Sequence, residues 1–381
     1  MIRDQATFAQ LTETIQRFVR ERLVPNEARI AEEDHVPAEI IADMRDMGLF
    51  GLSIPEEYGG LGLTMEEEVL IACEIGKTSP AFRSVFGTNN GIGSQGIVID
   101  GTDAQKQYWL PRLASGEIIS SFALTEANAG SDAASLSTSA KRDGDDYLLN
   151  GTKRFITNAP EAFIFTLMAR TGGPGAGGIS AFLVERGTPG LSLGKPEKKM
   201  GQQGAHICDV ILEDCRVPAA NIIGGVEGRG FKTALKVLDR GRLHIAAVCV
   251  GVAERLIADS LRYAMERQQF GKAIAEFQLV QAMLADSRAE AYAARCMVVD
   301  AARRKDANEP ISTEASCCKL FASEMVGRVA DRAVQIHGGA GYIADYGIER
   351  FYRDVRLFRI YEGTSQIQQI IIARNMIRDA S

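Results

Sequence analysis

The sequence has 381 residues, 46% of them hydrophobic and 24% charged, which is long enough for about two or three globular domains. Its net charge of −6 argues against a nucleic-acid-binding protein, and no uncharged apolar run is long enough to span a bilayer. The first residues lack the features of a signal or transit peptide, so we expect a cytoplasmic protein.

The first region, residues 1–117, is predicted to be helical. Phe8, Leu11, Ile15 and Phe18 recur at helical spacing, and a similar pattern returns over residues 65–75.

The pattern changes to short strands near residue 118. Apolar segments at 118–124, 147–149, 163–168, 179–184 and 210–212 are separated by Gly, Asp, Asn and Pro. Since no helix-length segments separate them, residues 118–230 are predicted to form an antiparallel β-barrel or sandwich.

Helical periodicity returns over residues 231–381, in segments near 231–265, 274–304, 312–337 and 365–378. Four long amphipathic helices favour a four-helix bundle. The fold class is therefore α+β, with a β domain between two helical domains.

Two other classes of site lose support from the sequence. Gly173–Gly178 matches the GxGxxG string of dinucleotide sites, but it precedes a strand where that motif must follow one and open a helix, so a hairpin loop is predicted. The seven cysteines are scattered without a CxxC pair, and no histidine has a partner at metal or triad spacing. Buried thiols are expected, with no metal site.

Several polar segments are candidates for a ligand site, although each has a plain structural interpretation. Thr125–Asp132 and Phe155–Asn158 follow predicted strands and suit either a cofactor or ordinary turns. Arg267 at a helix end fits either an anionic ligand or helix capping. Glu362, beside Gly363 and followed by hydroxyl and amide side chains, is the strongest candidate for acid–base chemistry.

Together these segments resemble the acyl-CoA dehydrogenase family, in the family's order and over nearly the whole chain. The specific matches are Thr125–Asp132, Arg267–Lys272, Gln335–Gly339 and Tyr361–Gln366. The resemblance implies non-covalent FAD, a homotetramer, and oxidation of an acyl-CoA in fatty-acid metabolism such as β-oxidation. It also implies that electron-transfer flavoprotein accepts the electrons.

The resemblance also implies which residues bind FAD, with part of the site supplied by a neighbouring subunit. The flavin side of the cofactor matches Phe122, Leu124, Thr125, Gly130, Ser131, Phe155, Ile156 and Thr157. The pyrophosphate and adenosine side, from the neighbour, matches Arg267, Phe270, Gln278, Gln335, Gly338 and Gly339, while Thr364 and Gln366 match the last flavin contacts.

By the same resemblance, Glu362 is the base that removes the α-proton of the thioester, while flavin N5 takes the β-hydride. Some relatives carry the base at the position of Gly241, which has no side chain here, so the role falls to Glu362. The substrate-binding positions that match are Ser131, Asp239, Arg242, Tyr361 and Gly363; Asp239 and Arg242 also suit a plain ion pair.

Two departures bear on specificity. Phe155 stands where the family commonly has Trp, and the only Trp is Trp109. The cluster Gly91, Gly93 and Gly96 matches the region lining the acyl pocket, which predicts a longer or wider pocket unless neighbours refill it. An acyl-CoA oxidase of the same fold and a catalytically idle acyl-CoA-binding scaffold are the alternatives.

Overall fold

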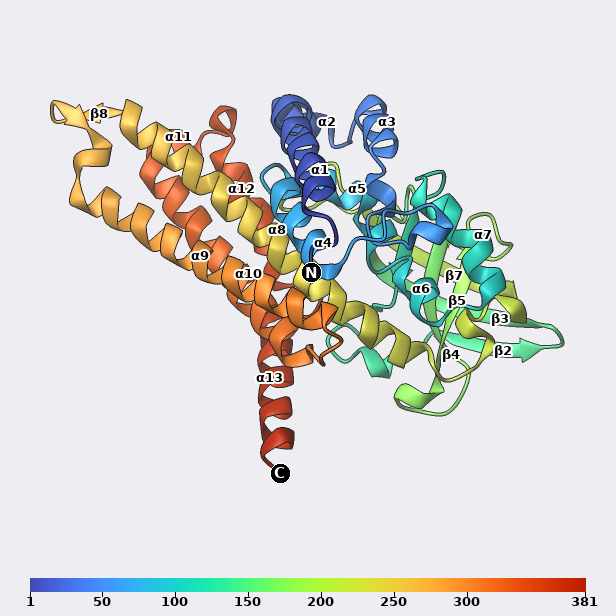
Figure 1. Cartoon of the computed structure of the whole chain (residues 1–381). Coiled ribbons are helices and arrows are strands. Elements are labelled where there is room, and N and C mark those ends of the chain that lie inside the picture. The colour runs from blue at the N-terminus through green and yellow to red at the C-terminus, as the bar shows by residue number, and fades with distance from the viewer.

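Seven α-helices make up the first region in the computed structural model, which describes residues 1–381 (Figure 1). They are α1 Gln5–Phe18, α2 Glu27–Glu33, α3 Ala38–Asp46, α4 Met65–Ile75, α5 Pro80–Asn90, α6 Gln95–Asp100 and α7 Asp103–Ala114. The predicted helical character is confirmed. Local chemistry sets the helix starts: Asp4 caps α1, and Thr64 with Glu67 forms a capping box at α4.

The middle region is a seven-stranded sheet. Its strands are β1 Ser120–Ala123, β2 Ser139–Asp143, β3 Asp146–Thr157, β4 Ile164–Arg170, β5 Ile179–Glu185, β6 Leu191–Leu193 and β7 Ile207–Pro218. The order is β1-β4-β2-β3-β7-β6, with β5 paired to β4. Most pairs are antiparallel as predicted, but β1 runs parallel to β4, with Ser120 opposite Ile164, and β2 meets β4 in one parallel pairing. Gly173–Gly178 lies in the connection between antiparallel β4 and β5, as expected for a hairpin loop.

The last region contains the predicted long helices, α8 Gly230–Glu266, α9 Gln278–Asp306, α10 Ser312–His337 and α13 Ser365–Ala380. A short hairpin, β8 Gln268–Gln269 and β9 Lys272–Ala273, joins α8 to α9, and α11 Gly339–Tyr342 and α12 Ile348–Val355 follow α10. The helices α8, α9 and α10 share one apolar core that includes Val248, Val298 and Met325. The helix α13 starts against α10 and then projects from the bundle (Figure 1).

Helix α4 ties the first region to the last. Its Met65, Val69 and Cys73 are buried in the same core as α8, α9 and α10. This packing brings the polar residues of α4 next to α8, close to where the three regions meet.

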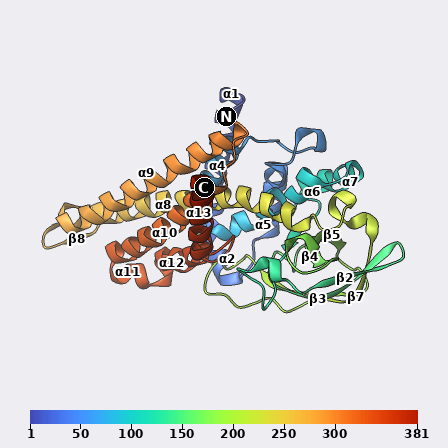
Figure 2. The same ribbon diagram turned by 90° about the horizontal axis from the view of Figure 1, so that it is seen from below.

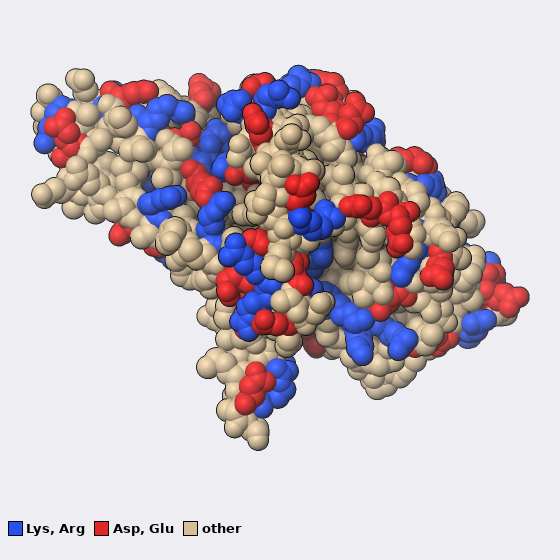
Figure 3. Space-filling model, in the orientation of Figure 1, with Lys and Arg blue, Asp and Glu red and all other residues tan.

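The surface carries both signs of charge, interspersed over the face seen in Figure 3. No helix has a segment long and apolar enough to cross a membrane. Five cysteines are buried, but Cys296 is exposed on α9, so the prediction of a buried thiol is wrong at that position.

Candidate active site

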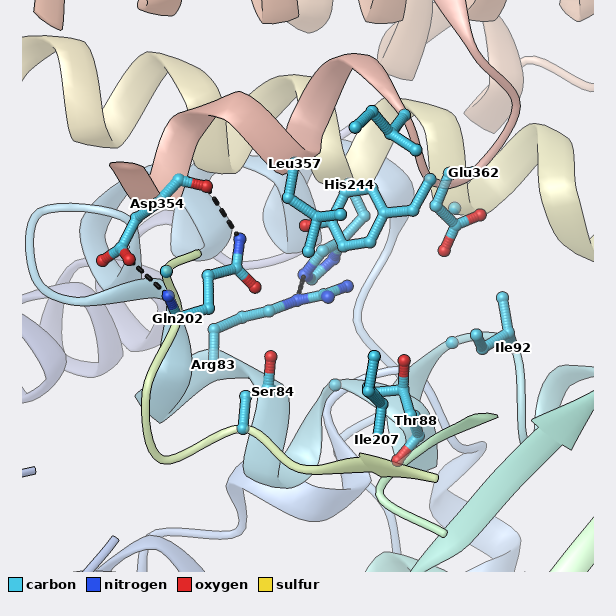
Figure 4. Close-up of a pocket in the computed structure, with 18 of the residues that line it drawn as sticks. Arg83, Ser84, Thr88, Ile92, Gln202, Ile207, His244, Asp354, Leu357 and Glu362 are labelled. Carbon is cyan, nitrogen blue, oxygen red and sulfur yellow. Dashed lines mark hydrogen bonds between the residues drawn. The ribbon is translucent and has the colours of Figure 1, made fainter. Parts of the chain in front are cut away.

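A partly enclosed cavity lies where the three regions meet (Figure 4). Its walls come from α4, α5, α8, α12, the segment 199–207 before β7, and the turn that precedes α13. The polar residues that line it are Glu68, Arg83, Ser84, Thr88, Thr157, Lys199, Gln202, Arg240, His244, Arg353, Asp354, Arg356, Tyr361 and Glu362.

The turn that carries Glu362 is held in an unusual backbone conformation. Glu362 has φ 57° and Gly363 has φ 85°, so two successive residues are left-handed. Such a conformation is uncommon for a residue with a side chain and persists only where surrounding contacts hold it. Here Lys319 Nζ donates to the Gly363 carbonyl at 2.6 Å, and Gln368 Nε2 donates to the carbonyls of Glu362 and Gly363 at 3.1 and 3.0 Å. The Thr364 hydroxyl then caps α13.

The Glu362 carboxylate points into the cavity and fills the space beside Gly241 of α8. A Cβ added to Gly241 would lie 2.7 Å from Glu362 Oε2, so a side chain there would displace the carboxylate. Oε2 is buried and has no hydrogen-bond partner. Burial raises the pKa of Glu362, and the positive charges of Arg83, Arg242 and Lys319 partly oppose that rise. The carboxylate thus has no partner within the chain and faces the cavity.

A line of polar residues from α4, α8 and α5 forms part of the cavity wall. His244 Nδ1 lies 3.0 Å from Glu68 Oε1, and Arg83 Nε donates to His244 Nε2 at 3.0 Å (Figure 4). Arg240 also pairs with Glu68. Burial lowers the pKa of His244, as does the charge of Arg83, so the imidazole is neutral and donates from Nδ1 while accepting at Nε2.

The predicted flavin segment, Thr125–Asp132, forms a turn that is held in place by hydrogen bonds to Glu126. Glu126 is buried and accepts hydrogen bonds from Lys153 Nζ at 2.7 Å and from the Ser137 and Thr138 amides at 2.7 and 2.9 Å. The amides of Gly130 and Ser131, beyond it, donate to no group of the chain. Leu124 is buried, and Phe122 and Thr125 are half-buried, at the end of β1.

Phe155 lies on an irregularity of β3 that turns its ring outward. Register shifts between Lys153 and Ile156, and φ of 60° at Phe155, mark a bulge. The Phe155 side chain is 52% exposed, while Ile156 is buried in the core of the β region. Thr157, next in the strand, lines the cavity that holds Glu362.

The other predicted FAD residues lie at the far end of the bundle. Arg267 and Phe270 belong to the hairpin after α8, and Gln278 opens α9. Tyr263 of α8 stacks on His337 at 4.3 Å between ring centroids, which places Gln335, Gly338 and Gly339 at the same end. Figures 1 and 2 both show the β8 hairpin at the opposite end of the molecule from β2, β3 and β7. One chain therefore does not bring the two predicted sets together.

The predicted substrate residues divide in the same way. Tyr361 lines the cavity with Glu362, whereas Asp239 and Arg242 form an ion pair at 2.6 Å and do not line it. The Gly363 carbonyl accepts a hydrogen bond from Lys319, and Gln366 is exposed on α13. Ser131 is exposed in the turn that follows β1. Of the glycine cluster, only Gly91 lines the cavity, since Gly93 packs on Ser120.

Sequence reasoning missed Glu68, Arg83 and His244 as a unit. They come from two regions, and 161 residues separate Arg83 from His244. The only local signal was Gly87, one helical turn after Arg83, where a Cβ would lie 2.9 Å from the Arg83 guanidinium carbon.

Comparison with known proteins shows which family the chain belongs to. The N-terminal, middle and C-terminal domains of acyl-CoA dehydrogenases match residues 6–117, 121–215 and 228–377. The chain therefore belongs to the acyl-CoA dehydrogenase family of FAD-dependent oxidoreductases.

Individual relatives cover almost the whole chain. The "Probable acyl-CoA dehydrogenase YngJ" of Bacillus subtilis is 43% identical over 96% of this chain and 97% of its own length. The "Caffeyl-CoA reductase-Etf complex subunit CarC" of Acetobacterium woodii is 41% identical over 92% of each. The structure of butyryl-CoA dehydrogenase from Megasphaera elsdenii superposes with a TM-score of 0.95 at 34% identity, covering 99% of this chain and 100% of that one.

The residues present fit a flavin. The outward ring of Phe155 offers a stacking surface, and the unpaired amides of Gly130 and Ser131 offer donors to its polar edge. The buried Glu126 joins the two segments, because it follows β1 and accepts a hydrogen bond from Lys153 of β3, two residues before Phe155.

Proposed function

We propose that this chain is an FAD-dependent acyl-CoA dehydrogenase that converts an acyl-CoA to its trans-2-enoyl-CoA, with Glu362 as the base. The observation that carries the proposal is that Glu362 lines the cavity and its Oε2 atom is buried there without a hydrogen-bond partner. A structural acid would be expected to have a hydrogen-bond partner.

The reaction needs an acid–base group because the α-proton of a thioester is only weakly acidic. The Glu362 carboxylate takes this proton as the Cα–H bond breaks, and its raised pKa brings it closer to that of the carbon acid. The Glu362 backbone amide donates to no group of the chain, which leaves it free for the thioester oxygen, where negative charge develops. FAD, when bound against Phe155, Gly130 and Ser131, would accept the β-hydrogen as a hydride.

The acceptor and the assembly belong to the same proposal. The name of the CarC relative associates that protein with an electron-transfer flavoprotein, which supports the same partner class here. The separation of the two FAD-binding sets, and exposed Phe270, Leu279 and Tyr342 at the hairpin end, support a homo-oligomer, and the family resemblance makes it a tetramer.

The direct test is anaerobic reduction of the bound flavin. The purified protein should be yellow, and a good acyl-CoA should bleach its absorbance near 450 nm. Glu362→Gln should keep FAD bound and abolish bleaching. Undiminished bleaching would remove Glu362 from the role of base, and a chain that takes up no FAD would point to an idle scaffold.

The reverse reaction is a second candidate, because CarC is named a reductase. In that direction protonated Glu362 would return a proton to Cα while the flavin gives back a hydride. Two rates would be compared: oxidation of the dithionite-reduced protein by a 2-enoyl-CoA, and reduction of the oxidised protein by the saturated acyl-CoA. A faster oxidation by the 2-enoyl-CoA would favour reductase function. Rapid peroxide formation under air would instead favour the oxidase alternative.

A further inference from the structure

Arg83 is a cation inside the cavity with spare hydrogen-bonding capacity. It comes from α5, and its side chain extends across the cavity below Glu362 (Figure 4). Within the chain only Nε donates a hydrogen bond, to His244, and no carboxylate lies within salt-bridge distance of Arg83. Both terminal nitrogens are therefore free to bind a ligand.

The chain holds this guanidinium in place without neutralising it. Neutral His244 accepts from Arg83 Nε and donates to Glu68, so the ring orients Arg83 but contributes no negative charge. The Glu68 carboxylate is paired with Arg240. Gly87 leaves room for the guanidinium to lie flat against α5. Ser84, the next residue of α5, also lines the cavity, and its hydroxyl makes no hydrogen bond within the chain.

An apolar acyl chain is a poor complement to this wall. Once the α-carbon lies against Glu362, a hydrocarbon tail would separate Glu362 from Arg83 and bury the guanidinium without an acceptor, which is unfavourable. A carboxylate at the far end of the acyl chain would accept two hydrogen bonds from the free terminal nitrogens.

We propose that the acyl pocket is built for an acyl-CoA whose chain ends in a carboxylate, an ω-carboxyacyl-CoA, and that Arg83 binds that carboxylate with help from the Ser84 hydroxyl. The inference rests on the proposed acyl-CoA function and names its substrate class. It applies in either reaction direction, because both use the same pocket.

The test measures binding separately from turnover. Calorimetry on FAD-loaded Glu362→Gln would compare glutaryl-CoA and adipyl-CoA with pentanoyl-CoA and hexanoyl-CoA. The carboxylated thioesters should bind on the order of 10- to 100-fold more tightly. Adding Arg83→Met should remove this preference, whereas Arg83→Lys should keep part of it. Arg216→Met, which removes an exposed arginine of β7, is the control with the same change in charge.

The outcomes separate this inference from the proposed function. Equal or tighter binding of the uncharged thioesters, or an equal loss for both classes in Arg83→Met with its FAD spectrum and melting temperature intact, would overturn the substrate class. If pentanoyl-CoA bleaches the wild-type flavin and glutaryl-CoA does not, the dehydrogenase proposal stands and this inference fails. Preferred glutaryl-CoA binding without any flavin reduction would support Arg83 and reject the dehydrogenase.

Discussion

Gly241 sets how closely the carboxylate of Glu362 approaches α8. Because a Cβ at this position would lie 2.7 Å from Glu362 Oε2, Gly241→Ala should push the carboxylate away from the α-carbon. We expect FAD to stay bound and the rate of flavin reduction by acyl-CoA to fall on the order of 10- to 100-fold in anaerobic stopped-flow measurements. Gly173→Ala, in an open loop, is the matched control. An unchanged rate in Gly241→Ala would show that Glu362 does not act from its observed position.

Lys319 links the fold of the turn to the ionisation of the base. Burial lowers the pKa of Lys319 to about 8, so at neutral pH it is mostly charged and its charge lowers the pKa of Glu362. Lys319→Met removes that charge and should raise the pKa of Glu362. Since the ionised form removes the proton, the rising limb of flavin-reduction rate against pH should move to higher pH. A slower reaction with an unmoved pH midpoint would mean that Lys319 only supports the turn.

At the scale of elements, the buried Asp354 clamps the segment before β7 to α12. Its side chain accepts from the Gln202 amide, and its carbonyl accepts from Gln202 Nε2 at 3.2 Å. Burial raises the pKa of Asp354 to about 6 from an ordinary 3.8, despite the Gln202 hydrogen bond and nearby Arg353. The folded state thus holds the proton on Asp354 more tightly than the unfolded state does. Protonated Asp354 therefore stabilises the folded state fully below about pH 4, and this contribution is lost by about pH 6.

Asp354→Asn should remove that pH dependence, because an amide cannot ionise. Relative to wild type, the variant should gain stability as pH rises from 4 to 6, by at most about 3 kcal/mol. Thermal melting of the two FAD-loaded proteins across this range would show it. A melting-temperature difference that stays constant with pH would contradict the raised pKa.

Local patterns predicted the elements better than the cavity. The long helices α8, α9 and α10 follow from apolar residues at helical spacing, and Glu362 and Gly241 follow from the motif around each. The strand β2 was missed because only one of its five residues is apolar, and β6 was missed because it has only three residues. The line from Glu68 through His244 to Arg83 depends on how α4, α5 and α8 pack, so no single stretch of sequence contains it.

At the scale of the whole molecule, the division of the predicted FAD residues makes a prediction about assembly. If a neighbour supplies Arg267 and Phe270, each site combines the β region of one chain with the hairpin end of another. Phe155→Asp should damage the first half and Arg267→Ala with Phe270→Ala the second. Each variant alone should then lose FAD at every site, because every site contains one damaged half.

Co-assembly of the two variants distinguishes a shared site from a site within one chain. In a mixed pair, one site receives both damaged halves and the other receives both intact halves. Random mixing by co-expression should therefore restore FAD to about a quarter of the sites, since intact halves meet only in that combination. The FAD content of each variant expressed alone provides the baseline. FAD content that never rises above this baseline, in oligomers of normal size, would place both halves of the cofactor site in a single chain.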